Sequence, residues 1–215
     1  MVRSAAVAAG FAGLESLLRQ TAHASLRHVL AQNAAVGLGA LVADPAKLID
    51  LPKGFSYHAF SRTGETMADG LLLPGRHDGM AAFAGEDGST ILIRNHEIEH
   101  RWVKDSPFGK DASLLSKVDR SRLFDAGFGK TPSLGGTTTV VYDTKAKAVR
   151  SQWMSLAGTN RNCAGGPTPW GSWLTCEEDT TVAGPEQEQS HGYVFEVPAT
   201  GTPSLFKAEP IRAMG

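Results

Sequence analysis

The feature that most restricts the fold of this chain is a series of short runs in which polar and apolar residues alternate, separated by turn residues. The clearest pair lies at residues 137–142 and 148–156, joined by the polar link Asp143-Thr-Lys-Ala-Lys147. Alternation with β-branched side chains is typical of strands, and so this pair predicts an antiparallel hairpin. Few stretches show helical periodicity over more than a dozen residues, and 24 of the 215 residues are glycine. The sequence therefore predicts an all-β fold of antiparallel hairpins.

Further strands are expected on both sides of this hairpin. They lie at residues 54–60, 80–83, 89–93, 170–177, 192–197 and 204–208. The turn Gly85-Glu-Asp-Gly88 predicts that the second and third of them form a hairpin. Residues 102–131 show neither the alternation of a strand nor the periodicity of a helix. A connection this long is expected to cover one end of the fold.

The N-terminal part differs from the rest of the chain. Residues 1–24 combine Arg3, an Ala-rich apolar run and Ala22-His-Ala24, which is the outline of a secretory signal, although Glu15 and Arg19 interrupt it. The alternative is an amphipathic helix of the mature domain. Residues 25–53 are interpreted as a helical leader, and residues 54–215 as the folded domain. The apolar run is too short to span a membrane, and so no stable membrane anchor is expected.

The net charge gives no support for a strongly anionic partner. The chain has 21 basic and 22 acidic residues, for a formal charge of −1. Such a balance gives no electrostatic signal for nucleic acid or for an anionic membrane surface.

The stretch Ala157–Asp179 concentrates the chemically distinctive residues. It holds both cysteines, two of the four tryptophans and three consecutive carboxylates at positions 177–179. Asn162, Cys163 and the glycines after them are expected to form a loop, in which Gly165 and Gly166 allow close backbone approach. From Trp170 the alternation predicts a strand, which directs Glu177 and Glu178 to opposite sides unless the strand ends there.

Three interpretations of this stretch stay open on the residues alone. The acidic residues could be a solvated turn, and Cys163 and Cys176 could form a disulfide in an exported protein. Alternatively, the stretch forms a mixed metal site, because a thiolate suits a transition ion such as iron while carboxylates suit calcium. No Cys-x-x-Cys or His-x-x-x-His is present, and so a closed zinc site is not supported.

A second polar group follows the expected strand at residues 89–93. The motif Arg94-Asn-His-Glu97 places an amide, an imidazole and a carboxylate at the strand exit, where loops commonly hold functional groups. Asn95 and Glu97 could supply oxygen ligands to a hard cation. The alternative is a charged, solvated loop, since Glu99, His100 and Arg101 come next.

Several of these motifs together resemble one protein family. They are Leu72-Leu-Pro-Gly-Arg-His-Asp-Gly-Met80, Arg94-Asn-His-Glu97, Gly135-Gly-Thr-Thr-Thr-Val-Val-Tyr-Asp143, Asn162-Cys-Ala-Gly-Gly-Pro-Thr-Pro-Trp-Gly-Ser-Trp-Leu-Thr-Cys-Glu-Glu178 and His191-Gly-Tyr-Val-Phe-Glu-Val197. In this order they resemble the PhoX-type alkaline phosphatases, which are exported bacterial proteins. The resemblance runs from about Gly54 to Gly215.

The resemblance implies a β-propeller whose channel holds iron and calcium ions and hydrolyses phosphate esters. Cys163 is then the iron-binding thiolate, and Glu178, Glu177 and Glu97 are further metal ligands. Asn162 and Asn95 are expected to bind substrate. His77 and Asp78 gain modest support, and no side chain is assigned as a nucleophile.

The resemblance also implies where the protein acts and how much of it is present. Family members are exported, and so export machinery is an expected partner and a periplasmic or secreted location is expected. They continue well beyond residue 215 with further glutamate-bearing motifs, and so this chain is expected to be an incomplete propeller with weak or absent activity of its own. The alternative function is a non-catalytic exported calcium-binding β-protein with a Cys163–Cys176 disulfide.

Overall fold

The computed structural model describes residues 37–214, which divide into two compact units at His58 and Ala59. The expected signal sequence, and residues 25–36 of the expected leader, lie outside the described residues. No helix within residues 37–214 is long and apolar enough to cross a membrane.

The described part of the first unit is a small hairpin and not a helix. Strands β1 (Leu41–Val42) and β2 (Leu51–Pro52) pair antiparallel. Asp44 organises the turn between them, because its carboxylate accepts the backbone N–H groups of Ala46 and Leu48. The Tyr57 hydroxyl also donates to Asp44 at 2.6 Å and, with the turn N–H groups, lowers the pKa of Asp44 to about 2. The helical prediction is therefore wrong for residues 37–53, where Gly, Asp and Pro favour turns.

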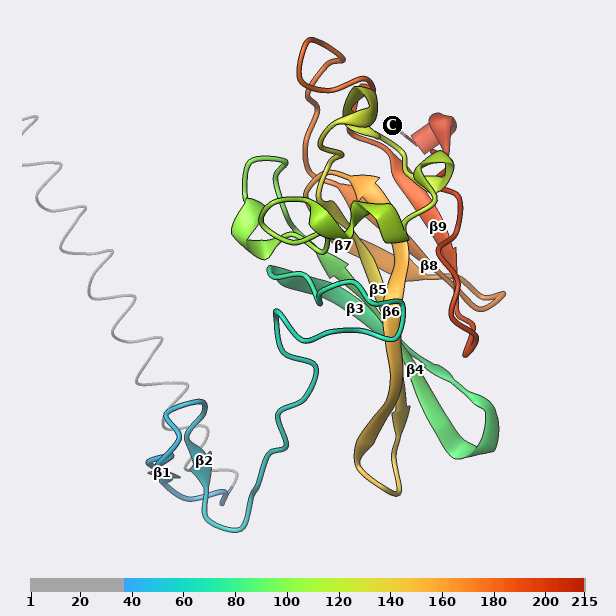
Figure 1. The fold of residues 1–215 in the computed structure, drawn as a ribbon. Helices are drawn as coiled ribbons and strands as arrows, with labels where there is room; N and C mark the ends of the chain where they lie inside the picture. Colours follow the sequence, from blue (N-terminus) through green and yellow to red (C-terminus); the bar gives the residue numbers. More distant parts are fainter. Residues whose placement is uncertain (1–36, 215) are drawn as a thin grey trace, which may run out of the picture. The chain divides into compact units, whose positions relative to one another are not determined.

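The second unit begins with a four-stranded antiparallel sheet in chain order (Figure 1). Its strands are β3 (His77–Ala84), β4 (Ser89–His96), β5 (Gly135–Asp143) and β6 (Ala148–Thr159). A short turn, η1 (Glu86–Gly88), closes the β3–β4 hairpin. Both hairpins that the alternating pattern predicted are thus confirmed.

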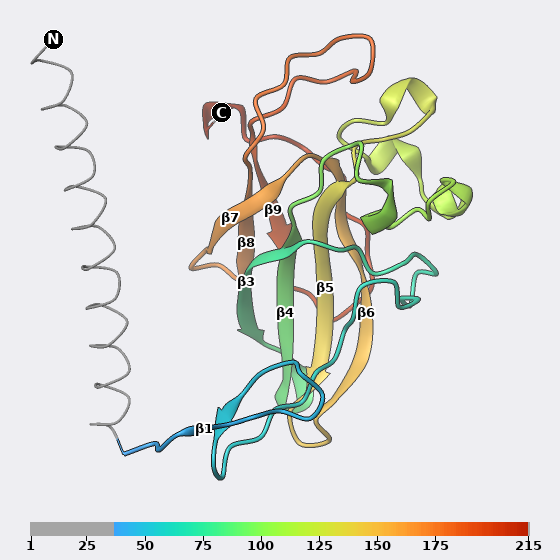
Figure 2. The ribbon, with the colours of Figure 1, turned by 90° about the vertical axis from the view of Figure 1, so that its left-hand side faces the viewer.

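A three-stranded antiparallel sheet follows, again in chain order. It consists of β7 (Asn162–Pro167), β8 (Ser172–Glu177) and β9 (Val194–Pro198). The chain passes from the first sheet to the second through only Asn160 and Arg161 (Figure 2). The prediction of a loop at residues 162–169 is wrong for β7, since this segment pairs with β8 despite its two glycines and its proline.

The two sheets pack on each other through an apolar core. Alternate residues of β4, Ile91 and Ile93, contact Trp173 of β8 and Phe195 of β9 in one cluster of buried side chains. Because side chains alternate along a strand, Asn95 and then Glu97 continue the β4 face that looks toward the second sheet.

The long segment between β4 and β5 covers one end of the first sheet. It contains four short 3-10 turns: η2 (Val103–Asp105), η3 (Ser113–Lys117), η4 (Arg120–Arg122) and η5 (Gly127–Gly129). A second buried cluster fixes it to the sheet and includes Met67, Leu71, Leu73, Ile98, Phe108, Leu115, Leu123, Leu134 and Met154. These apolar side chains explain why a segment without regular strands is nevertheless ordered.

The fold is therefore mostly β, with separate antiparallel sheets, no closed barrel and only short helical turns among the described residues. Two expected strands are absent. Residues 54–60 do not form a strand, and near residues 204–208 the chain makes an isolated bridge, between Phe195 and Pro210. Alternation alone cannot show whether a neighbouring strand exists to receive the backbone hydrogen bonds.

Neighbouring glycines in β7 give a test of this packing. A Cβ on Gly165 would overlap the Leu174 carbonyl oxygen and lie 2.5 Å from the Trp173 ring, whereas a Cβ on Gly166 meets nothing within 4 Å. We expect Gly165→Ala to lower the free energy of unfolding by about 1 to 3 kcal/mol, because the backbone must shift. Gly166→Ala should change it by less than about 0.5 kcal/mol. Urea denaturation of both variants measures the difference, and equal stabilities would contradict the close contact.

Candidate functional site

Two β-bulges that face each other form the base of the candidate site. In β3 the register shifts by one residue between His77 and Met80, and so Asp78 and Gly79 lie opposite Asn95. In β7 it shifts between Asn162 and Gly165, and so Cys163 and Ala164 lie opposite Cys176. Bulges turn a side chain out of the regular alternation and are common beside active sites.

Asn95 joins the two bulges. Its amide nitrogen donates to the backbone carbonyls of Cys163 and Ala164, both at 3.0 Å, and its oxygen accepts the Trp173 indole N–H at 2.8 Å. Gly79 permits the close approach, since a Cβ there would lie 2.6 Å from the Cys163 carbonyl oxygen. The motif glycine and the motif asparagine thus fix the position of the Cys163 backbone.

Arg161 holds two of the predicted carboxylates together. Its guanidinium donates to Glu97 at 2.8 Å and to Glu178 at 3.1 Å. Its backbone is held as well, because its N–H donates to Ile98 and its carbonyl accepts from Glu178. Arg161 has φ of +49°, a left-handed conformation that is uncommon for a residue with a side chain. The two-residue crossing between the sheets requires this bend.

Asp78, Glu97, Cys163 and Glu178 form what we call the carboxylate–thiol cluster. Loss of solvation raises the pKa of Asp78, and a hydrogen bond with Glu97 raises it further. Burial raises the pKa of the Cys163 thiol, and the charges of Glu178, Asp78 and Glu97 add to this effect. Three carboxylates repel one another and the thiolate, and the Arg161 guanidinium offsets part of this repulsion.

The side chains of this cluster are of the chemical types that bind cations. Three carboxylates and a thiol are ligands for hard and for thiophilic ions respectively, and their mutual repulsion would be relieved by a positive ion. Within residues 37–214, however, no group of three or more His, Cys, Asp or Glu side chains has converged to a ligating arrangement. Glu97 and Glu178 point instead to Arg161.

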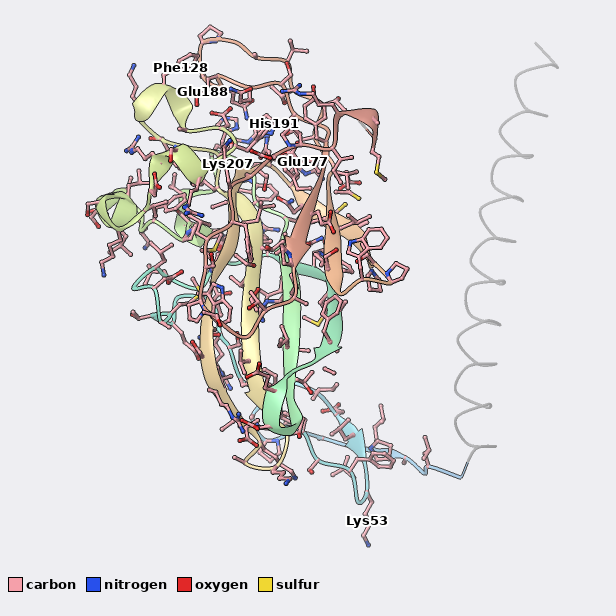
Figure 3. The ribbon with its side chains drawn as sticks, turned by 90° about the vertical axis from the view of Figure 1, so that its right-hand side faces the viewer. Lys53, Phe128, Glu177, Glu188, His191 and Lys207 are labelled. Carbon is pink, nitrogen blue, oxygen red and sulfur yellow. The ribbon has the colours of Figure 1, made fainter. Side chains whose placement is uncertain are left out.

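Glu177 lies in a different environment from Glu178. Its buried carboxylate accepts the N–H groups of Asn160, Gly192 and Tyr193 at 2.8, 2.8 and 3.2 Å. The imidazole of His191 lies between Glu177, at 2.6 Å, and Asp125, at 3.3 Å (Figure 3). The structure thus places neighbouring glutamates on opposite sides, one buried in a polar network and one at the cluster.

The remaining predicted residues also have protein partners. Asn162 is fully buried and bonds to the hydroxyls of Thr159 and Thr175. The amide of Asn95 is used in the contacts described above. The substrate-binding roles of Asn95 and Asn162 and the ligand role of Glu177 stay predictions.

The two cysteines are free thiols in different surroundings. Cys176 lies on the neighbouring strand, where burial raises its pKa and no carboxylate adds to the effect. The structure therefore contains thiols where the alternative interpretation expects a disulfide, and only Cys163 belongs to the carboxylate cluster.

Sequence reasoning missed Arg161 as a member of the site. It stands two residues before Cys163, in the stretch that already attracted attention, but an arginine there carries no ligand signal. Arg161 lies at the site because the chain passes there from the first sheet to the second. No local sequence pattern predicts where that passage occurs. Asp78 was noticed only weakly, because its direction depends on the bulge in β3.

One family model matches most of the chain. The model of the family described as alkaline phosphatase PhoX matches residues 36–142 and 129–215. The chain belongs to the PhoX alkaline phosphatase family. Neither a curated protein nor a solved structure matches it. Within the PhoX chain, the carboxylate–thiol cluster draws on both matched segments, with Asp78 and Glu97 in the first and Cys163 and Glu178 in the second.

The His191 network gives this protein a testable pH dependence. Burial lowers the pKa of His191, but the hydrogen bonds and charges of Asp125 and Glu177 outweigh it and raise the pKa to about 9. Because the unfolded value is about 6.5, this stabilisation is complete below pH 6.5 and is lost as the pH rises through about 9. We expect the free energy of unfolding to fall by about 2 kcal/mol from pH 7 to pH 9.

Urea denaturation across this pH range measures the slope, and NMR titration of the histidines identifies its source. His191→Gln should be less stable at pH 7 and should lose most of the slope. A flat profile for the native protein would contradict a charged His191.

Proposed function

We propose that this PhoX protein is a metal-dependent phosphate ester hydrolase whose metal site is the carboxylate–thiol cluster. The observation that supports this most is that two facing bulges carry Asp78 and Cys163, 85 positions apart in the chain, while Glu97 and Glu178 lie close enough to act electrostatically on the Cys163 thiol. Family membership supports phosphatase chemistry, and the donor set supports a cation. Iron at Cys163 and calcium at the carboxylates are the expected ions.

Bound cations at such a site would bind phosphate oxygens and provide charge stabilisation and a nucleophile at ordinary pH. The chain's own residues set the conditions for this. Asn95 and Gly79 fix the Cys163 backbone, and the Glu177 network fixes the strand end that carries Glu178. Glu97 and Glu178 would hold such a cation, and the Arg161 guanidinium that they now bind would then be free to donate to an oxygen of the phosphate group.

The finer architecture belongs to the same proposal. We propose that the four-stranded and the three-stranded antiparallel meanders, which share an apolar cluster, are consecutive blades of a propeller. The cluster then lies where the first sheet passes into the second. Export to the periplasm or the cell exterior is part of the proposal and rests on the N-terminal sequence and the family.

The two cysteines provide a matched test of the metal site. Cys163→Ser should abolish iron binding and remove the phosphatase activity that the native chain shows, because the ligand lost is the thiolate of the cluster. Cys176→Ser should keep both, since this thiol has no carboxylate neighbour. Elemental analysis and hydrolysis of an aryl phosphate measure the two effects. Native iron content and turnover in Cys163→Ser would refute the assignment.

Arg161 should oppose metal binding and assist catalysis. Arg161→Gln removes the internal cation that a metal must displace from Glu97 and Glu178, and so we expect tighter calcium binding by calorimetry, by about tenfold. The same variant should hydrolyse aryl phosphate more slowly, because a positive charge beside the phosphate is lost. Arg101→Gln is a suitable control, since Arg101 pairs with Glu99 outside the cluster. Weaker calcium binding in Arg161→Gln would contradict the competition.

A further inference from the structure

A separate pocket of about 670 Å³ lies at the outer end of the covering segment. Its lining includes His100, Arg101, Phe128, Lys130, Ser133 and Gln187, and none of the members of the carboxylate–thiol cluster. The volume is in the range of pockets that hold small organic ligands. Its polar groups come from three distant parts of the chain, which only the fold brings together.

Phe128 is held at this pocket in an unfavourable conformation. It has φ of +52°, between Gly127 and Gly129, which also have positive φ. A left-handed backbone is a genuine outlier for a bulky side chain. Glu188 supports it, because its two carboxylate oxygens accept the N–H groups of Ala126 at 2.8 Å and of Phe128 at 3.0 Å (Figure 3).

The ring gains little from the rest of the protein in return, since 57% of Phe128 is exposed. Glycine would take the same backbone without strain, and a buried phenylalanine would at least contribute to the core. A strained and exposed aromatic residue at the rim of a pocket indicates a ligand-binding role.

The charges around the pocket leave one cation for a ligand. Arg101 pairs with Glu99 at 2.7 Å, and His100 lies 3.5 Å from Glu186. The Lys130 ammonium makes no hydrogen bond or ion pair with any residue in the described range. Ser133 and Gln187 also line the pocket, but both are buried, and the Gln187 amide donates to the Ser133 hydroxyl at 3.5 Å.

We propose that this pocket binds a phosphate ester with a flat aromatic group, of the nucleoside monophosphate class. The base stacks on the exposed Phe128 ring, and the phosphate pairs with Lys130. This site is distinct from the metal site and does not depend on turnover.

Calorimetry on metal-stripped protein, with its fold verified by circular dichroism, isolates the pocket. Without metal, hydrolysis and metal-held phosphate cannot contribute, and so a failure of the proposed catalytic function would not affect the result. The probes are adenosine 5′-monophosphate, adenosine and inorganic phosphate. We expect the monophosphate to bind more tightly than either fragment.

Two variants separate the ring from the charge. Phe128→Gly should weaken the monophosphate and adenosine by about tenfold, since stacking is lost, while the thermal midpoint stays equal or rises because the strain is relieved. Lys130→Gln should weaken the monophosphate and phosphate about fivefold and leave adenosine unchanged, and high salt should reduce this difference. Trp170→Ala, at an exposed aromatic residue outside the pocket, is the control and should bind normally.

Three results would overturn this proposal. Absence of monophosphate binding at millimolar concentration, or equal binding by the native protein and Phe128→Gly, would overturn the proposal. Equal affinity for adenosine and its monophosphate would remove the anion from the ligand class and so also overturn it.

Discussion

The three hydrogen bonds of the Asn95 side chain are the interaction on which the arrangement of the site depends. They cross from β4 to the bulge of β7 and to the Trp173 indole, inside the interface between the two sheets. A buried amide that loses such partners would cost about 1 to 3 kcal/mol per unsatisfied group, and so the register between the sheets is strongly specified. Because β7 cannot slide past β4, the Cys163 backbone has one position relative to Glu97.

The Glu177 network fixes the other side of the same crossing. One carboxylate accepts three backbone N–H groups and the His191 imidazole, and these donors come from the β6–β7 link and from the approach to β9. Glu177 therefore links the connection between β6 and β7 to the segment that precedes β9. Its neighbour Glu178 lies at the opposite side, where its backbone N–H donates to Arg161 and its exposed carboxylate pairs with the Arg161 guanidinium. The strand end therefore carries one carboxylate that is fully enclosed by the protein and one that solvent can reach.

The sequence predicted most of the strands, both hairpins of the first sheet and several of the residues that lie together at the site. Alternation identified β3 to β6 and β8 because these strands have one face in the core, and the same signal placed Glu177 and Glu178 on opposite sides. It failed at residues 54–60, where alternation exists without a neighbouring strand, and at β7, where Gly165 suits close packing against Trp173 as well as it would suit a loop. The bulges, and with them the directions of Asp78 and Cys163, depend on pairing between strands and have no local signal.

Left-handed backbone occurs at eight described residues other than glycine, and two of them lie at the sites described above. Arg161 and Phe128 both adopt it, at a cost of about 1 to 2 kcal/mol for each residue. At Arg161 the cost has a structural cause, since two residues must turn the chain from one sheet into the next, and the ion pairs with Glu97 and Glu178 reward the same bend. At Phe128 no sheet crossing demands the conformation, and flanking glycines could have made the turn alone. The exposed Phe128 ring is the feature that this turn presents at the rim of the pocket, which is why we assign the ligand role to it.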